Sequence, residues 1–202
     1  ANTYPFRQDS SFLYFFGLDS PGLAAVLDVD EGKEIVFGDD VTLEDIIWVG
    51  PQPPLKDRAK AAGLKLVRPS ASLTDYLAEA TSRGRQIHYL PPYRGETILK
   101  LSSWLKIAPE QVKSGASIEL IKAVISLRSV KSKEEVAEIE KALKVTKESY
   151  LTAIPEIRPG VREQEILALM ELVIRANGLS FAFPPIITIN GQIFHKTSYG
   201  DK

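Results

Sequence analysis

The chain has 202 residues, of which 44% are hydrophobic and 25% are charged, a composition typical of a globular protein with one large or two small hydrophobic cores. Its 25 lysines and arginines nearly balance its 26 aspartates and glutamates, so the formal net charge is -1 and no excess positive charge is present to bind nucleic acid or an anionic membrane. The sequence has no cysteine, which excludes disulfides, thiolate nucleophiles and thiolate metal sites.

Nothing in the sequence predicts a membrane protein. No stretch approaches the roughly 20 apolar residues that cross a bilayer, and the N-terminus lacks the order of a signal peptide. We therefore expect a cytoplasmic protein with no nucleic-acid and no membrane partner. The chain opens at Ala1 without methionine, and we interpret it as cut from something longer.

The first half of the sequence is predicted to alternate short strands and helices. Apolar, aromatic or β-branched runs separated by turn residues predict strands over residues 12–16, 23–28, 33–37, 46–50, 64–67 and 86–90. Helical patterns are expected over residues 56–62, 72–80 and 95–107. The first strands are expected to be antiparallel neighbours, and the alternation as a whole predicts a layered α/β sheet.

The character of the sequence changes near Arg128. Ser132 and Glu135 form an S-x-x-E capping box. Behind the box, a mostly apolar stripe on a helix of several turns is predicted by Val136, Ile139, Leu143, Thr146 and Tyr150. Pro155 and then residues 159–160 are expected to end this helix.

A second helix and a hairpin are predicted after residue 160. The helix should cover residues 162–177 and stop at Gly178. Its expected buried face consists of Ile166, Leu169, Met170 and Val173. The hairpin should pair residues 181–189 with residues 192–195 through an Asn-Gly turn.

We place a domain boundary at residue 128, which gives a first domain over 1–128 and a second over 129–202. A unit as small as the second buries little surface. We therefore expect it to lean on the first domain or to belong to a larger domain that continues past Lys202.

The two histidines are the first candidates for chemistry. His88 lies inside a predicted strand, where a single polar residue is usually hydrogen-bonded or faces solvent. His195 follows the Asn-Gly turn at the end of the hairpin, from which an imidazole can project toward a cavity. His195 is therefore the more interesting of the two histidines, although position alone favours a structural role for both.

Other motifs offer little. The sequence contains no H-E-x-x-H, no Walker or G-x-G-x-x-G loop and no G-x-S-x-G, so no metal ligand and no cofactor-binding residue is identified. Solvated roles are expected for the carboxylate pairs Asp28 with Asp30, Asp39 with Asp40, and Glu134 with Glu135. Arg7 is expected to pair with Asp9 rather than to bind a ligand, and the aromatic residues at 12–16 are expected in the core.

Two stretches together resemble aminopeptidase P. Residues 4–17, YPFRQDSSFLYFFG, are similar to a segment of that family's N-terminal domain. The pattern R-x-x-K-x-x-x-E-x-x-x-I, which starts at Arg128, resembles the beginning of its catalytic helix. The later order of residues is similar to the opening of the pita-bread fold shared by methionine aminopeptidase, prolidase, creatinase and aminopeptidase P: Pro159, Gly160, Glu163, Glu165, Gly178, Phe183, Gly191 and His195.

The resemblance implies an α/β fold: a creatinase-type N-terminal domain with a mixed sheet over 1–128, followed by the incomplete start of a pita-bread α+β catalytic domain over 129–202. It implies a metal-dependent exopeptidase that acts on peptides with proline second, using manganese or a similar divalent pair. In that family the ligands, two aspartates, a histidine and two glutamates, come after the position of His195, which itself contacts substrate. We therefore expect no metal and no activity in this chain alone, and a homo-oligomer, dimer or higher.

Two positions depart from the family's pattern, and two other functions stay open. Arg162 stands where relatives commonly have a threonine helix cap, and Lys196 stands where they often have an aromatic residue. The alternatives are a non-catalytic pita-bread module that binds peptides or proteins, and an enzyme with a different substrate, an X-Pro dipeptide or creatine.

Overall fold

The structure is a computed structural model that describes residues 6–191. These residues form two compact units, of which the first ends at Arg128 and the second begins at Ser129. His195 and residues 192–195 of the expected hairpin lie outside the described residues. No helix in the described part of the chain is long and apolar enough to cross a membrane.

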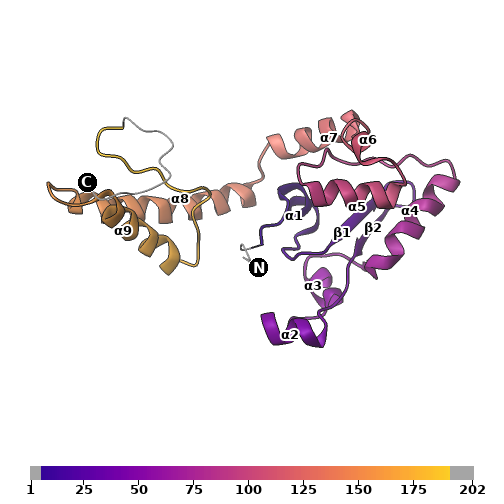
Figure 1. The fold of residues 1–202 in the computed structure, drawn as a ribbon, viewed down its shortest axis with the longest axis horizontal. Coiled ribbons are helices and arrows are strands. Elements are labelled where there is room, and N and C mark those ends of the chain that lie inside the picture. The colour runs from indigo at the N-terminus through magenta and orange to yellow at the C-terminus, as the bar shows by residue number, and fades with distance from the viewer. Residues whose placement is uncertain (1–5, 192–202) are drawn as a thin grey trace. The chain divides into compact units, whose positions relative to one another are not determined.

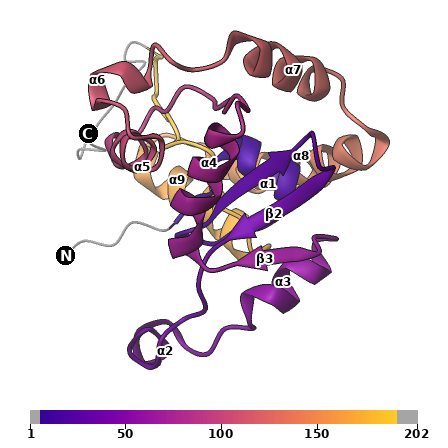
Figure 2. The ribbon, with the colours of Figure 1, turned by 90° about the vertical axis from the view of Figure 1, so that its right-hand side faces the viewer.

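A three-stranded mixed sheet forms the centre of the first unit, in the order β1-β2-β3. Figure 1 labels β1 and β2, and Figure 2 labels β2 and β3. Strand β1 (Ala24–Asp28) runs antiparallel to β2 (Lys33–Phe37), with Asp28 opposite Lys33. Strand β3 (Leu66–Arg68) runs parallel to β2. The expected α/β fold with a mixed sheet is thus confirmed, as is the antiparallel pairing of the runs at 23–28 and 33–37.

Helices cover both faces of this sheet. The helices of the first unit are α1 (Ser10–Phe16), α2 (Leu43–Val49), α3 (Leu55–Ala61), α4 (Leu73–Ser82), α5 (Gly95–Leu105), α6 (Pro109–Val112) and α7 (Ile118–Ser129), with a short 3-10 turn, Ser70–Ser72, before α4. Successive side chains of a strand point to opposite faces. Val36 therefore packs with α1 and α3, while Ile35 and Phe37 pack with α4 on the other face. Figure 2 shows these helices around β2.

The predicted strand at residues 12–16 is wrong, because these residues belong to helix α1. The carboxylate of Asp9 accepts the amides of Ser11 and Phe12 at the start of the helix, and Gly17 ends it with a positive φ of 63°. Spacings of three and four place Phe12 and its neighbours at 15 and 16 against the core. The expectation that the aromatic residues are core is confirmed for these three phenylalanines.

The predicted strands at 46–50 and 86–90 are also wrong. Residues 46–49 lie in helix α2, which begins with a capping box between Thr42 and Asp45. Residues 86–90, all of them described, form no strand. Their segment is instead held by the end of α6 and the loop that follows it: the hydroxyl of Tyr89 donates to the carbonyl of Val112, and the backbone carbonyl of Tyr89 accepts the amide of Ser117.

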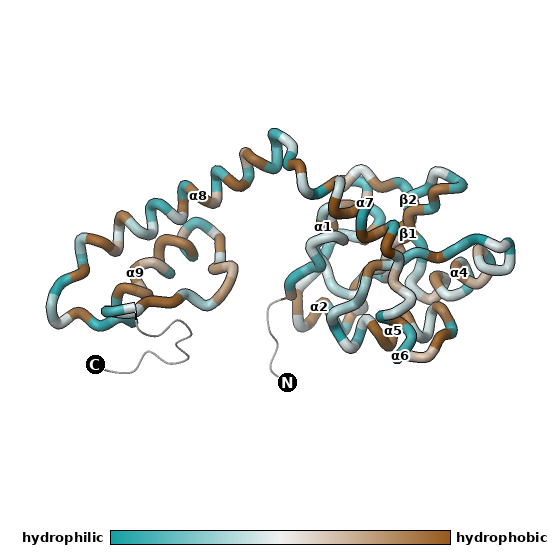
Figure 3. Tube along the Cα trace, turned by 90° about the horizontal axis from the view of Figure 1, so that it is seen from above, coloured by the Kyte–Doolittle hydropathy of each residue, from teal (hydrophilic) through white to brown (hydrophobic). Residues whose placement is uncertain are grey.

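The second unit is a pair of packed helices, α8 (Lys133–Ala153) and α9 (Glu163–Ala176), joined through a 3-10 turn, Ile154–Glu156. The predicted capping box of α8 is present, and both helices match their predicted ranges closely. Apolar residues recur along both helices in Figure 3. Ala153, Ile166 and Met170 form a buried hydrophobic cluster, and Ser149 and Ile174 are buried as well.

Much of the apolar surface of the second unit is not covered by its described residues. Val136, Ile139 and Leu143 of the predicted stripe are exposed. Residues 181–191 form no strand, contrary to the hairpin prediction. A strand requires a hydrogen-bonded neighbour, and no described residue of this unit supplies one.

Candidate functional site

Of the two histidines, only His88 lies among the residues that the structure describes. His195 lies outside the described residues, so its catalytic role stays a prediction. His88 is exposed, and its Nδ1 lies 2.7 Å from the hydroxyl of Ser117. The hydrogen-bonded, solvent-facing ring agrees with the structural role expected for His88.

The contacts of His88 do not form a catalytic triad. The hydroxyl of Ser117 donates to Glu119 Oε2 at 3.1 Å and accepts the amide of Leu120 at 3.2 Å. In a Ser-His-Asp triad the imidazole lies between the hydroxyl and the carboxylate, whereas here the hydroxyl lies between the other two groups. This arrangement satisfies the first turn of α7 and activates no nucleophile.

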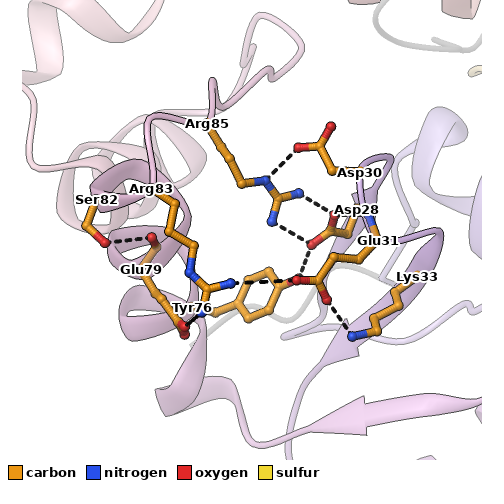
Figure 4. A network of polar contacts seen from close by, with 9 residues as sticks. All are labelled: Asp28, Asp30, Glu31, Lys33, Tyr76, Glu79, Ser82, Arg83 and Arg85. Atoms are coloured by element: carbon orange, nitrogen blue, oxygen red, sulfur yellow. Dashed lines mark hydrogen bonds and ion pairs between the residues drawn. The ribbon is translucent and has the colours of Figure 1, made fainter.

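An extensive polar arrangement joins the β1-β2 hairpin to the end of α4. We call it the Asp28 network; it consists of Asp28, Asp30, Glu31, Lys33, Tyr76, Glu79, Arg83 and Arg85 (Figure 4). Asp28 ends β1, and the two residues after Val29 lie in the turn to β2. Tyr76 and Glu79 project from α4, and the two arginines follow that helix.

At the centre of the network, Arg85 binds both oxygens of the buried Asp28 carboxylate. Arg85 also donates its Nε to Asp30 at 2.7 Å. The hydroxyl of Tyr76 and the amide of Glu31 donate to the same Asp28 carboxylate. All four acceptor positions of Asp28 are therefore in use.

The electrostatics of the network follow from these bonds. The pKa of Asp28 is held far below its ordinary value by Arg85 first and the Tyr76 hydroxyl second. Asp28 in turn raises the pKa of Arg85. Burial, followed by the hydrogen bond to Asp28, raises the pKa of Tyr76. Asp28 is thus held as a carboxylate, Arg85 as a cation and Tyr76 as a neutral phenol. None of the three is poised to exchange a proton near neutral pH.

The network stabilises the fold and offers no general acid, general base or nucleophile for catalysis. A shallow hollow of about 220 Å³ lies beside it, lined by Glu31, Arg68, Tyr76, Glu79, Ala80, Arg83 and Arg85. Within the described part of the chain, no three His, Asp or Glu side chains gather closely enough to hold a metal ion. A divalent pair therefore does not fit the described residues.

Several carboxylates expected to be merely solvated have structural partners. Asp28 is buried in the network, Asp39 binds Ser70, and Asp40 accepts the amide of Leu55 at the start of α3. Asp9 caps α1, so the predicted pair between Asp9 and the neighbouring arginine at position 7 is not found among the described contacts. An aspartate after a strand or before a helix signals such capping, and this signal was available in the sequence.

The long-range members of the network could not be found from spacing. Tyr76 and Arg85 lie 48 and 57 positions after Asp28. Neither belongs to a motif with a fixed separation, so only the fold brings them to the carboxylate.

The comparisons with known proteins agree with the fold. Residues 1–88 match the family model of the aminopeptidase P N-terminal domain. A probable Xaa-Pro aminopeptidase of Chaetomium globosum is 25% identical over 197 residues, which cover 97% of this chain and 32% of the relative. Xaa-Pro aminopeptidase 3 of Homo sapiens is 24% identical over 205 residues, and the alignment covers 91% of this chain and 38% of the human protein.

Solved structures give the same picture. A low-pH form of aminopeptidase P from E. coli superposes with a TM-score of 0.69 at 21% identity, over 87% of this chain and 42% of the other. Aminopeptidase PepP of Pseudomonas aeruginosa gives a TM-score of 0.69 over 87% of this chain and 41% of its own. The chain spans only 32% to 40% of the curated relatives it matches. Residues 1–88 are therefore similar to the aminopeptidase P N-terminal domain, and the chain as a whole is similar to part of the length of Xaa-Pro aminopeptidases.

Proposed function

We propose that this chain is part of an X-Pro aminopeptidase, a metal-dependent exopeptidase that releases the N-terminal residue from peptides with proline second. The observation that carries the proposal is the match of residues 1–88 to the aminopeptidase P N-terminal domain. The alignment of 97% of the chain with a probable Xaa-Pro aminopeptidase supports it. The peptide is the partner that this activity requires.

Proline in the second position calls for a dedicated enzyme. It removes the amide hydrogen of the bond to be cut and fixes φ near -65°. An enzyme that recognises an ordinary extended peptide through that amide loses the contact, so the proline ring must be accommodated by a pocket of its own shape.

The first unit is proposed to support the catalytic domain without performing chemistry. The carboxylate of Asp28 supports this role, because its four acceptor positions are all in use and leave it no freedom to act as a base or nucleophile. Assays on X-Pro peptides test the proposal: the complete protein should cleave them with manganese present, and this chain alone should not. Cleavage by the complete protein that a chelator leaves unchanged would contradict metal dependence.

His195 is proposed to contact the substrate beside the metal pair, as the resemblance implies. The described residues do not supply the metal ligands, so these are proposed to come from elsewhere in the complete protein. Replacing His195 by Ala should lower kcat of the complete protein while its metal content, measured by atomic emission, stays unchanged. A parallel loss of metal would make His195 a ligand instead.

We also propose a homo-oligomer in which helix α2 contacts a second copy. Leu43, Ile47 and Trp48 of this helix are each more than 80% exposed, and Figures 1 and 2 show α2 projecting from the rest of the first unit. Exposed tryptophan is typical of interface hot spots. Trp48→Lys should shift the mass of the complete protein toward the monomer in light scattering.

A matched control for this variant lies in the turn between β1 and β2. Val29 is 87% exposed, so Val29→Lys adds the same charge at a similarly exposed apolar position. It should leave the mass unchanged. Equal masses for both variants and the parent protein would remove α2 as the contact.

A cytoplasmic location is the remaining part of the proposal. The absence of cysteine from the sequence is compatible with a reducing compartment.

A further inference from the structure

Two of the three asparagines in the sequence are followed by glycine, Asn177 before Gly178 and Asn190 before Gly191. In such a pair, the backbone nitrogen of glycine can attack the side-chain carbonyl carbon of asparagine, because glycine has no side chain to obstruct the approach. The new C–N bond closes a five-membered succinimide, and ammonia leaves. Water then opens the ring to aspartate or isoaspartate.

The first pair is held away from this reaction by the end of helix α9. Asn177 donates its side-chain amide back to the carbonyl of Val173 at 2.9 Å, so the group points away from the following nitrogen. The amide of Gly178 donates to the carbonyl of Arg175 at 2.9 Å. Both reacting groups are therefore engaged in bonds of the helix C-terminus, and α9 is itself anchored by its buried residues.

The second pair lies in an exposed bend outside any helix or strand. No contact with another described residue engages the side chain of Asn190. The amide of Gly191 donates only to the hydroxyl of Thr188, at 2.8 Å within the same bend. One local hydrogen bond is thus the sole described restraint on the attacking nitrogen.

We propose that Asn190 is a site of spontaneous deamidation in the folded chain, and that Asn177 is protected from the same reaction. The two sites share their local chemistry, so the fold alone selects between them. The product adds one negative charge beside Ile189 in a segment whose exposed residues are largely apolar. Where isoaspartate forms, the backbone also lengthens by one carbon at this bend.

The experiment compares the two sites within one molecule. The full chain is incubated in mildly alkaline buffer at body temperature, and peptide mapping by mass spectrometry follows the conversion of each asparagine, with isoaspartate identified by its enzymatic methylation. Asn190 should convert while Asn177 remains intact. In denaturant the two sites should convert at similar rates, because both are Asn-Gly pairs without structure.

Thr188→Val tests the proposed restraint, because it removes the hydroxyl and keeps the β-branched shape. The folded variant should deamidate Asn190 about fivefold faster, the ratio that corresponds to one typical hydrogen bond. Asn190→Gln serves as the control and should abolish the product. Equal rates at both sites in the folded chain, or a folded ratio no different from the denatured one, would overturn the proposal, as would no conversion at Asn190.

Discussion

Two glycines that look alike in the sequence differ in the space around them. A Cβ on Gly38 would lie 2.5 Å from Leu23 Cδ2 and 2.9 Å from Leu55 Cδ2, whereas one on Gly95 would meet no atom within 4 Å. Gly38→Ala should lower the free energy of unfolding by about 1–3 kcal/mol, because it overpacks the core. Gly95→Ala should raise it by roughly 0.5 kcal/mol, because alanine has less entropy to lose.

Chemical denaturation of the two glycine variants beside the parent chain gives both values. A fully relaxed site would show no cost for Gly38→Ala. Similar effects for both glycines would therefore mean that the Leu23 and Leu55 side chains can move aside.

The buried carboxylate of Asp28 predicts how stability depends on pH. Its pKa is lower in the folded chain than in the unfolded one, mainly because of Arg85. The folded state therefore binds fewer protons near pH 4, and the stabilisation from Asp28 is present above an unfolded pKa of about 3.9. This stabilisation should be lost as the pH falls from there toward the lower folded pKa.

Asp28→Asn removes this titration. The variant should be less stable than the parent chain at neutral pH, and the difference should shrink as denaturation is repeated at lower pH below about 4. Asp30→Asn is the control: Asp30 also contacts Arg85, but its side chain is 70% exposed, so a small effect is expected. A gap between Asp28→Asn and the parent that stays constant down to strongly acidic pH would contradict the assignment.

Helix α1 depends on its cap, since it has only seven residues and short helices are marginal by themselves. Asp9→Ala should lower the free energy of unfolding by about 1 kcal/mol, because the amides of Ser11 and Phe12 lose their acceptor. Asp9→Asn keeps an acceptor oxygen and should lose much less. Thermal unfolding of both variants checks the prediction, which fails if alanine and asparagine are equivalent.

The short helices α1 and α2 were predicted as strands, because their length leaves the periodicity of the sequence ambiguous. Four to seven apolar residues fit a strand or two helical turns equally well, and the caps Asp9 and Thr42 decide in favour of helices α1 and α2. The β1-β2 pair was predictable because turn residues separate two β-favouring runs. Helices α8 and α9 were predictable because length, periodicity and terminal signals agree.

Across the whole chain, sequence patterns predict the fold class better than they predict the contacts of the candidate site. The mixed sheet follows from local alternation, but the partners of Asp28 are set by packing between β1, α4 and the segment after it. The candidate His195 came from one local turn and a family resemblance, and it lies outside the described residues. Local signals therefore identify elements, whereas contacts between distant residues arise from the tertiary fold.

The division into two units predicts two levels of stability. In the first unit, two clusters with six and four buried residues enclose β2 from both sides, whereas residues 129–191 of the second unit show one cluster of three. Local stability follows the buried apolar contacts. Hydrogen exchange followed by mass spectrometry should therefore find the amides of β2 protected longest and those of α8 and α9 exchanging much sooner.

Two core variants separate this expectation from a single cooperative fold. Leu55 is buried beside β2, and Met170 is buried between α8 and α9. Leu55→Ala should weaken the protection of β2 by about 2–5 kcal/mol and leave α9 unchanged, whereas Met170→Ala should do the reverse. If Met170→Ala lowered the protection of β2 as much as that of α9, the amides of both units would exchange through one common unfolding event. The two units would then unfold as one.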